Sequence, residues 1–337
     1  MSKFQRYLLN KITWFLVAFA VALVFNFLLI RLIPGNPVDS MVARIAAGGG
    51  VSGEAMERIY RAYMAEFGLD KPLWMQFLVY LGNLARGDLG ASFRQYPARV
   101  SGLILQALPW TIALQLPAIL IGWILGNVLG ALSAYKKGWL DRGLFPVSLF
   151  ISCMPYYCLS IILVYLFAVH WRIFPASGGY SFDMNPSWTW AFFQSALQHY
   201  VLPFLSLVLI FTGTQAVGMR AMCVYELDAD YVRYSRSLGV KDRSIIGYIF
   251  RNGMLPQVTG LALSIGGMMS GALITEIVFS YPGIGFLLFG AIRTEDYPVV
   301  QGITLLIMIA VLLANFLVEI AYGFIDPRIR AATAGER

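Results

Sequence analysis

The placement of charge along the chain is the feature that most constrains its fold. Between successive charged residues lie six uncharged runs of 19 to 36 residues. They cover residues 12–30, 100–135, 143–171, 184–219, 252–275 and 297–318. About 20 apolar residues cross the hydrocarbon core of a bilayer as a helix, and six such runs are not expected in a water-soluble fold. We therefore predict an all-α integral membrane protein with six transmembrane helices.

The distribution of basic residues predicts the orientation of these spans. Only 13% of the residues are charged and the net charge is +7, and 15 of the 25 basic residues fall at the two ends or in segments between alternate spans. Orientation signals have this placement, so both termini are expected in the cytoplasm and no nucleic-acid partner is expected. The run at 12–30 is too long for a signal peptide and is interpreted as the first span.

The chain divides into four predicted segments. Residues 1–33 form an N-terminal stub and the first span, and residues 34–99 form an external amphipathic helical region. Residues 100–325 form a five-helix core, and residues 326–337 form a cytoplasmic tail. Within the core, the third span is expected at about 145–170, the fourth at about 200–222, the fifth at about 255–279 and the sixth at about 299–322.

The external region has the periodicity of two short helices. Apolar side chains recur at helical spacing from Met56 to Phe67, and Gly68 is placed to end that helix. Lys71 and Pro72 then open a second helix, which carries another apolar face. Neither helix is long enough to span a bilayer, so both are predicted on the outer surface or over the mouth of a pore.

The polar segment 223–251 lies between the fourth and fifth spans and is expected in the cytoplasm. It contains one apolar helical stripe, formed by Leu227, Tyr231, Tyr234 and Leu238. Asp230 and Arg233 can pair at a spacing of three, and Gly239 is placed to cap the helix end. A short amphipathic helix between two spans is suited to the groove of a partner, and equally to the lipid headgroups.

Several kinds of chemistry are absent from the sequence. No Gly-x-x-x-x-Gly-Lys-Ser/Thr motif occurs, so the chain is not expected to bind nucleotide phosphates itself. His170 and His199 have no Cys, Asp or Glu at ligand spacing, and no metal site is expected. No Ser–His–Asp arrangement is evident, and no catalytic residue is assigned. The chain is therefore not expected to be an enzyme.

Two carboxylates fall inside predicted spans, at Glu276 and Glu319. An ionisable group there needs a partner or water to offset its cost. Glu276, near the outer end of the fifth span, either faces a pore vestibule or forms a hydrogen bond to the end of a neighbouring helix. Both interpretations stay open from the sequence.

Seven stretches together resemble one protein family. They are RLIPGNP at 31–37, FGLDKPLWMQF at 67–77, GDLGAS at 87–92, RNGMLP at 251–256, TEIVFSYPGIG at 275–285, DYPVVQG at 296–302 and DPRIR at 326–330. In this order they resemble the binding-protein-dependent ABC transporter permeases of the dipeptide, oligopeptide and nickel class. The long external region resembles the first permease subunit of such systems.

The resemblance implies a cytoplasmic coupling helix at about 226–241. Gly239 fits the general pattern of this helix, but Arg233-Tyr234-Ser235 stands where Glu-Ala-Ala is usual, while Asp230–Arg233 resembles the peptide-class version. The residues expected to couple to the ATPase are Asp230, Tyr231, Arg233, Tyr234, Arg236, Leu238 and Gly239. Arg233 and Arg236 are the expected charged contacts, and Tyr231, Tyr234 and Leu238 the expected apolar anchor. Glu276, Tyr281 and Pro282 are the candidate pore or gate residues.

The resemblance also implies an assembly in the bacterial inner membrane. Its expected members are a second homologous permease subunit, two ATP-binding subunits and an extracytoplasmic substrate-binding protein, all in contact with membrane lipid or with one another. No cofactor is expected in this chain, because ATP and Mg would be bound by the partner ATPase subunits. The expected substrates are small peptides, then oligosaccharides or nickel chelates. The alternatives are a stand-alone secondary transporter or channel and a scaffold subunit without a pore.

Overall fold

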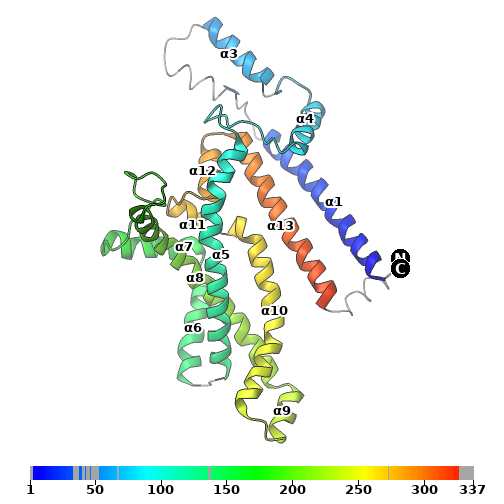
Figure 1. Ribbon diagram of the computed structural model, residues 1–337, viewed down its shortest axis with the longest axis vertical. Coiled ribbons are helices and arrows are strands. Elements are labelled where there is room, and N and C mark those ends of the chain that lie inside the picture. Colours follow the sequence, from blue (N-terminus) through cyan, green and yellow to red (C-terminus); the bar gives the residue numbers. More distant parts are fainter. Residues whose placement is uncertain are drawn as a thin grey trace. The chain divides into compact units, whose positions relative to one another are not determined.

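The computed structural model describes residues 3–32, 38–39, 42, 46, 53–66, 68–135, 138–271 and 273–325, and its regular elements in these ranges are helices (Figure 1). Its helices are α1 (Lys3–Leu32), α3 (Gly53–Glu66), α4 (Leu73–Ala85), α5 (Val100–Tyr135), α6 (Trp139–Cys153), α7 (Tyr156–Leu163), the π-helix η1 (Val164–His170), α8 (Trp190–Leu227), α9 (Asp230–Ser237), α10 (Asp242–Gly271), α11 (Leu273–Val278), α12 (Ile284–Arg293) and α13 (Tyr297–Ile325). These ranges contain no strand, which confirms the all-α class. The stretches at 33–37 and 326–330 and the predicted tail lie outside them.

The helices belong to two compact units, and each unit is described by itself. Unit 1 consists of Met1–Pro109, Leu287–Leu312 and Arg330–Arg337, and unit 2 consists of Trp110–Phe286 and Leu313–Ile329. Unit 1 therefore contains α1, α3 and α4, and unit 2 contains every helix from α6 to α11. Helices α5, α12 and α13 contribute to both.

Four helices are long and apolar enough to cross a membrane. They are Gln5–Leu32, Val100–Tyr135, Trp190–Leu227 and Tyr297–Ile320. A bent pair of helices, Asp141–Cys153 and Tyr156–His170, makes a fifth if it counts as one span. Among the described residues α10 does not reach the same standard. The chain is thus a multi-pass membrane protein, and the number six stays a prediction.

The third predicted span is broken, where the sequence predicted one helix over 145–170. Helix α6 ends at Cys153, Met154 is extended with φ −80° and ψ 129°, and Pro155 precedes α7. The helix axis bends by 104° at this break. A proline has no N–H to donate and disfavours the helical conformation of the residue before it, so the helix stops at this point.

The helix of the fourth predicted span is α8, which begins at Trp190, ten residues before the predicted start of the span near residue 200. Thr189 caps this end, and its side chain accepts a hydrogen bond from Phe192 N at 3.4 Å. A Thr before an apolar helix is a standard start signal. The segment between the third and fourth predicted spans therefore contains the first turns of α8.

In unit 2, α8 packs against α6, α7 and α10, and it also meets a row of glycines on α5. A methyl group on Gly122 would collide with Phe211 of α8, and one on Gly126 or Gly130 would collide with the α8 backbone. Small residues at four-residue spacing let two helix backbones approach this closely in a membrane. We call this contact the glycine seam.

In unit 1, two separate sequence stretches are held together by one carboxylate. Asp296 is buried and accepts hydrogen bonds from Ser92 Oγ, from Phe93 N at 2.9 Å and from Arg94 N at 3.2 Å. The predicted short helices are confirmed as α3 and α4. Gly68 ends α3 as expected, with φ +63°.

Candidate functional site

The candidate site is α9, the short helix between α8 and α10, at the end of unit 2 shown lowest in Figure 1. Gly239 follows its last turn with φ +69°, a conformation that glycine adopts without strain. Gly239 N donates to Arg236 O at 3.0 Å and Val240 N donates to Ser235 O at 3.1 Å. These two bonds are a Schellman motif, which confirms the capping role predicted for Gly239.

One apolar residue fixes α9 to the helix bundle. Val232 is fully buried in a small core to which α5, α8 and α10 all contribute. The other buried members of this core are Ala134, Met219, Cys223, Ile245 and Ile249. Burying a valine side chain contributes about 1.5 kcal/mol or more, which is substantial for a helix of two turns. Helix α9 is therefore a packed part of unit 2.

Glu226 is the polar counterpart of Val232. Its Oε2 accepts a hydrogen bond from Tyr231 Oη at 2.6 Å and another from Asn252 Nδ2 at 3.3 Å. One carboxylate thus joins the end of α8, the first turn of α9 and the first turns of α10. Burial, and then the bond to Glu226, raise the pKa of Tyr231 to about 12, so its hydroxyl remains a donor at neutral pH.

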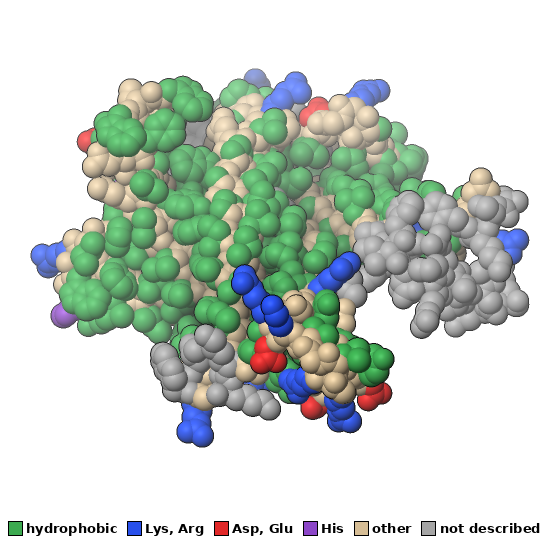
Figure 2. All heavy atoms as spheres, turned by 60° about the horizontal axis from the view of Figure 1, so that its bottom comes forward, with side chains coloured by type: hydrophobic (Ala, Val, Ile, Leu, Met, Phe, Trp, Pro, Cys, Tyr) green, Lys and Arg blue, Asp and Glu red, His purple; other side chains and the backbone are tan. Residues whose placement is uncertain are grey.

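The outward surface of α9 carries most of the residues expected to contact a partner. Tyr234 and Leu238 are 67% and 63% exposed. Asp230, Arg233 and Arg236 are also exposed, and Asp230 and Arg233 form no ion pair in the described structure. Figure 2 shows basic and acidic side chains gathered at this end of the molecule.

The predicted apolar stripe of α9 does not form a single face. Tyr231 turns inward to Glu226, whereas Tyr234 and Leu238 point away from the core. The residue that anchors the helix is Val232, which the sequence analysis did not select. A valine between two tyrosines gives no periodic signal in an eight-residue helix, so only the packing could identify it.

A bidentate ion pair lies close to this core. Asp141 of α6 accepts from Arg220 Nε at 2.7 Å and from Arg220 Nη2 at 2.9 Å, and it also accepts from Ser133 Oγ of α5 at 2.6 Å. The guanidinium stacks on the ring of Phe145 at 4.0 Å. The pair joins α5, α6 and α8 one turn from Cys223. The sequence analysis treated Arg220 only as an orientation signal and missed its partner.

Glu276 lies in a buried junction of unit 2, and its geometry matches the second of the two interpretations left open. Its Oε1 accepts from Thr111 Oγ1 at 2.8 Å, and its Oε2 accepts from Gly285 N at 2.7 Å in the first turn of α12. Thr111 Oγ1 also accepts from Ile284 N at 2.8 Å. A carboxylate at a helix N-terminus is favoured by the unpaired N–H groups there. Glu276 thus caps α12, and a side chain on Gly283 would collide with it.

The other two candidate pore residues surround the same junction. Tyr281 is 2% exposed and meets the ring of Trp110 edge-on at 5.6 Å. Pro282 lies so close to Gly179 that a side chain on this glycine would collide with it. Within this chain these residues therefore hold the loop after η1 against the turn before α12.

Comparison with protein families identifies the class. The model of the binding-protein-dependent transport system inner membrane component matches residues 126–331, which include α8, α9 and α10. The chain belongs to this family. The matched region covers more than half of the sequence and contains the α9 segment and Glu276.

Full-length relatives of this family member are found in several bacteria. The di/tripeptide transport system permease protein DppB of Pseudomonas aeruginosa is 37% identical over 90% of this chain and 93% of its own length. The dipeptide transport system permease protein DppB of Escherichia coli K12 is 33% identical over 96% of this chain and 98% of its own length. A putative peptide permease protein of Brucella suis is 32% identical over 96% and 99%. The resemblance predicted from the seven sequence stretches is confirmed.

The attachment of α9 predicts how the permease responds to loss of Glu226. Glu226→Ala should loosen α9 while leaving the bundle folded, because it removes two hydrogen bonds but no core side chain. We expect amide hydrogen exchange in residues 229–240 to rise about tenfold, the effect of a loss of about 1.4 kcal/mol. Asp228→Ala, two residues away and exposed, is the matched control and should leave exchange unchanged. Equal exchange in both variants would contradict the attachment.

Proposed function

We propose that this chain is the transmembrane permease subunit of an ATP-driven importer that moves small peptides from the outside into the cytoplasm. The observation that carries the proposal is α9, a helix packed against α5, α8 and α10 while Arg233, Tyr234 and Arg236 stay exposed. The substrate class follows the names of the relatives, which are permeases of dipeptide, di/tripeptide or peptide transport systems.

The proposed mechanism uses α9 as the contact with a motor. Tyr234, Leu238, Arg233 and Arg236 would seat in a cleft of an ATP-binding subunit, which binds ATP and Mg. When two such subunits close on nucleotide, α9 moves with them. Val232 and Glu226 then transmit the displacement to α8 and α10. A conformational change of this kind requires contacts that differ between two states, and a packed helix can carry such a difference.

The proposed assembly contains a second homologous permease subunit, two ATP-binding subunits and an extracytoplasmic substrate-binding protein. In it the chain crosses the bacterial inner membrane six times, with both termini and α9 on the cytoplasmic side. The fifth span would consist of α10 with α11, and α10 begins with the charged residues Asp242 and Arg243. The basic residues at the ends and around α9 support this orientation.

Purification tests the assembly. With an affinity tag on this chain and its neighbouring subunits co-expressed, two ATP-binding proteins should co-elute with it, and reconstituted vesicles should take up dipeptide only with ATP and the binding protein. Dipeptide uptake by the chain alone, at the rate of the complex, would instead establish a stand-alone transporter. A scaffold role would be indicated by co-elution without any uptake.

Tyr234 provides a sharper test of the coupling mechanism. Tyr234→Asp should reduce ATP-dependent uptake about tenfold or more, because it places a carboxylate at a proposed apolar contact. Tyrosine is one of the residue types that most often contribute strongly to the affinity of protein interfaces. The thermal midpoint should not change, since the side chain is 67% exposed. Tyr234→Phe keeps the ring and should retain uptake. Normal uptake by Tyr234→Asp would contradict a role for this residue in coupling.

A further inference from the structure

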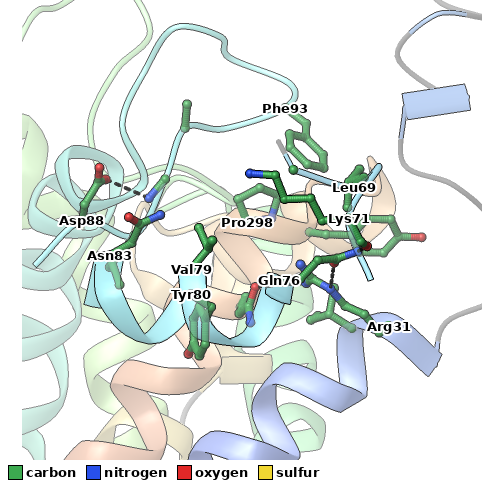
Figure 3. A pocket seen from close by; sticks show the side chains of 18 of the residues that line it. Arg31, Leu69, Lys71, Gln76, Val79, Tyr80, Asn83, Asp88, Phe93 and Pro298 are labelled. Atoms are coloured by element: carbon green, nitrogen blue, oxygen red, sulfur yellow. Dashed lines mark hydrogen bonds between the residues drawn. The ribbon is translucent and has the colours of Figure 1, made fainter. Parts of the chain in front are cut away.

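Unit 1 contains a cavity of about 540 Å³ that the transport mechanism does not use. It is lined by the end of α1, the turn between α3 and α4, one face of α4, the segment 88–93 and the start of α13 (Figure 3). Cavities of this volume are typical of sites that hold a small molecule or a chemical group of a larger one.

A cation without a counter-charge lines this cavity. The Arg31 guanidinium donates from Nε to Gln76 Oε1 at 3.2 Å and from Nη1 to Gln301 Oε1 at 3.4 Å, and it stacks on the ring of Phe27 at 4.6 Å. Both acceptors are neutral amides, and no carboxylate in the described part of the chain pairs with this guanidinium. A partly buried charge without an opposite charge costs free energy, which a bound anion would offset.

Gln301 adds a second donor to the same place. Because its Oε1 accepts from Arg31, the orientation of the amide is fixed and Nε2 points the other way. This Nε2 is buried and has no hydrogen-bond partner in the described structure. Figure 3 shows Lys71 among the residues that line the cavity, with its ammonium end directed away from Arg31. The Arg31 guanidinium and an unused amide donor are a set suited to an oxyanion.

The location of the cavity indicates the source of that anion. Arg31 is the last residue but one of the candidate span Gln5–Leu32, so the cavity lies where an apolar run ends. Helix α4, which lines one side, exposes a row of large apolar side chains. These are Leu73, Trp74, Met75, Leu78 and Val79. An exposed aromatic and aliphatic surface beside a basic cavity fits the boundary between lipid chains and headgroups.

We propose that this cavity binds the phosphate group of a membrane phospholipid. Arg31 and the Nε2 of Gln301 donate to the phosphate oxygens, and the acyl chains lie along the apolar face of α4.

Lipid retention tests the proposal on the full-length chain with the subunits that copurify with it. The complex is placed in phospholipid nanodiscs, extracted with mild detergent and examined by native mass spectrometry for retained lipid. Wild-type protein should retain bound phospholipid. Arg31→Gln should lower the affinity about tenfold, the effect of losing one charge-assisted bond.

Two controls decide between the outcomes. Arg86→Gln changes an exposed arginine at the end of α4 that does not line the cavity, and it should retain lipid as wild type does. Equal retention by wild type and Arg31→Gln would overturn the site. Inorganic phosphate and dialanine are added separately as soluble anions. If either raises the thermal midpoint in an Arg31-dependent way and lipid does not, the anion site has a soluble ligand and the lipid assignment is wrong.

Discussion

The close approach of α5 and α8 is the contact on which the rest of unit 2 depends. Gly122, Gly126 and Gly130 allow the two backbones to meet, and any side chain at these positions would collide with α8. One turn beyond the last glycine, Ala134 and Met219 form the base of the core that receives Val232. There is no strong hydrophobic driving force between helices in lipid, so α5 and α8 depend on close packing at the glycine seam. The glycine seam therefore sets the surface on which α9 packs.

The attachment of α9 combines two kinds of contact with different consequences. The burial of Val232 stabilises α9 against the core but does not fix its orientation, because the hydrophobic effect is non-directional. The hydrogen bonds of Glu226 are directional and fix the angle of α9 to α8 and α10. A displacement of α9 must therefore move the ends of both spans. In the same chain Glu276 accepts a hydrogen bond from Gly285 N and so caps α12. Location inside an apolar helix pattern thus does not by itself assign a carboxylate to a pore.

Much of this structure follows from local sequence signals. Runs of uncharged residues predicted the long helices, and Gly68 and Gly239 ended α3 and α9 where the sequence placed them. The break at Pro155 and the cap at Thr189 were also encoded locally, but composition across a 20-residue window hides them. Val232, the glycine seam and the Asp141–Arg220 pair could not be predicted, because each depends on which helices become neighbours. The family, carried by seven ordered stretches, was accessible from sequence alone.

The central claim is that α9 is a cytoplasmic contact for a separate ATPase. The most direct test is to measure on which side of the membrane α9 lies. Ser237→Cys, in a background with Cys153, Cys158 and Cys223 replaced, presents one exposed thiol at the end of α9. A membrane-impermeant maleimide should label it in inside-out vesicles and not in right-side-out ones, and Glu54→Cys in α3 should give the opposite pattern. Labelling of position 237 in right-side-out vesicles would contradict the account.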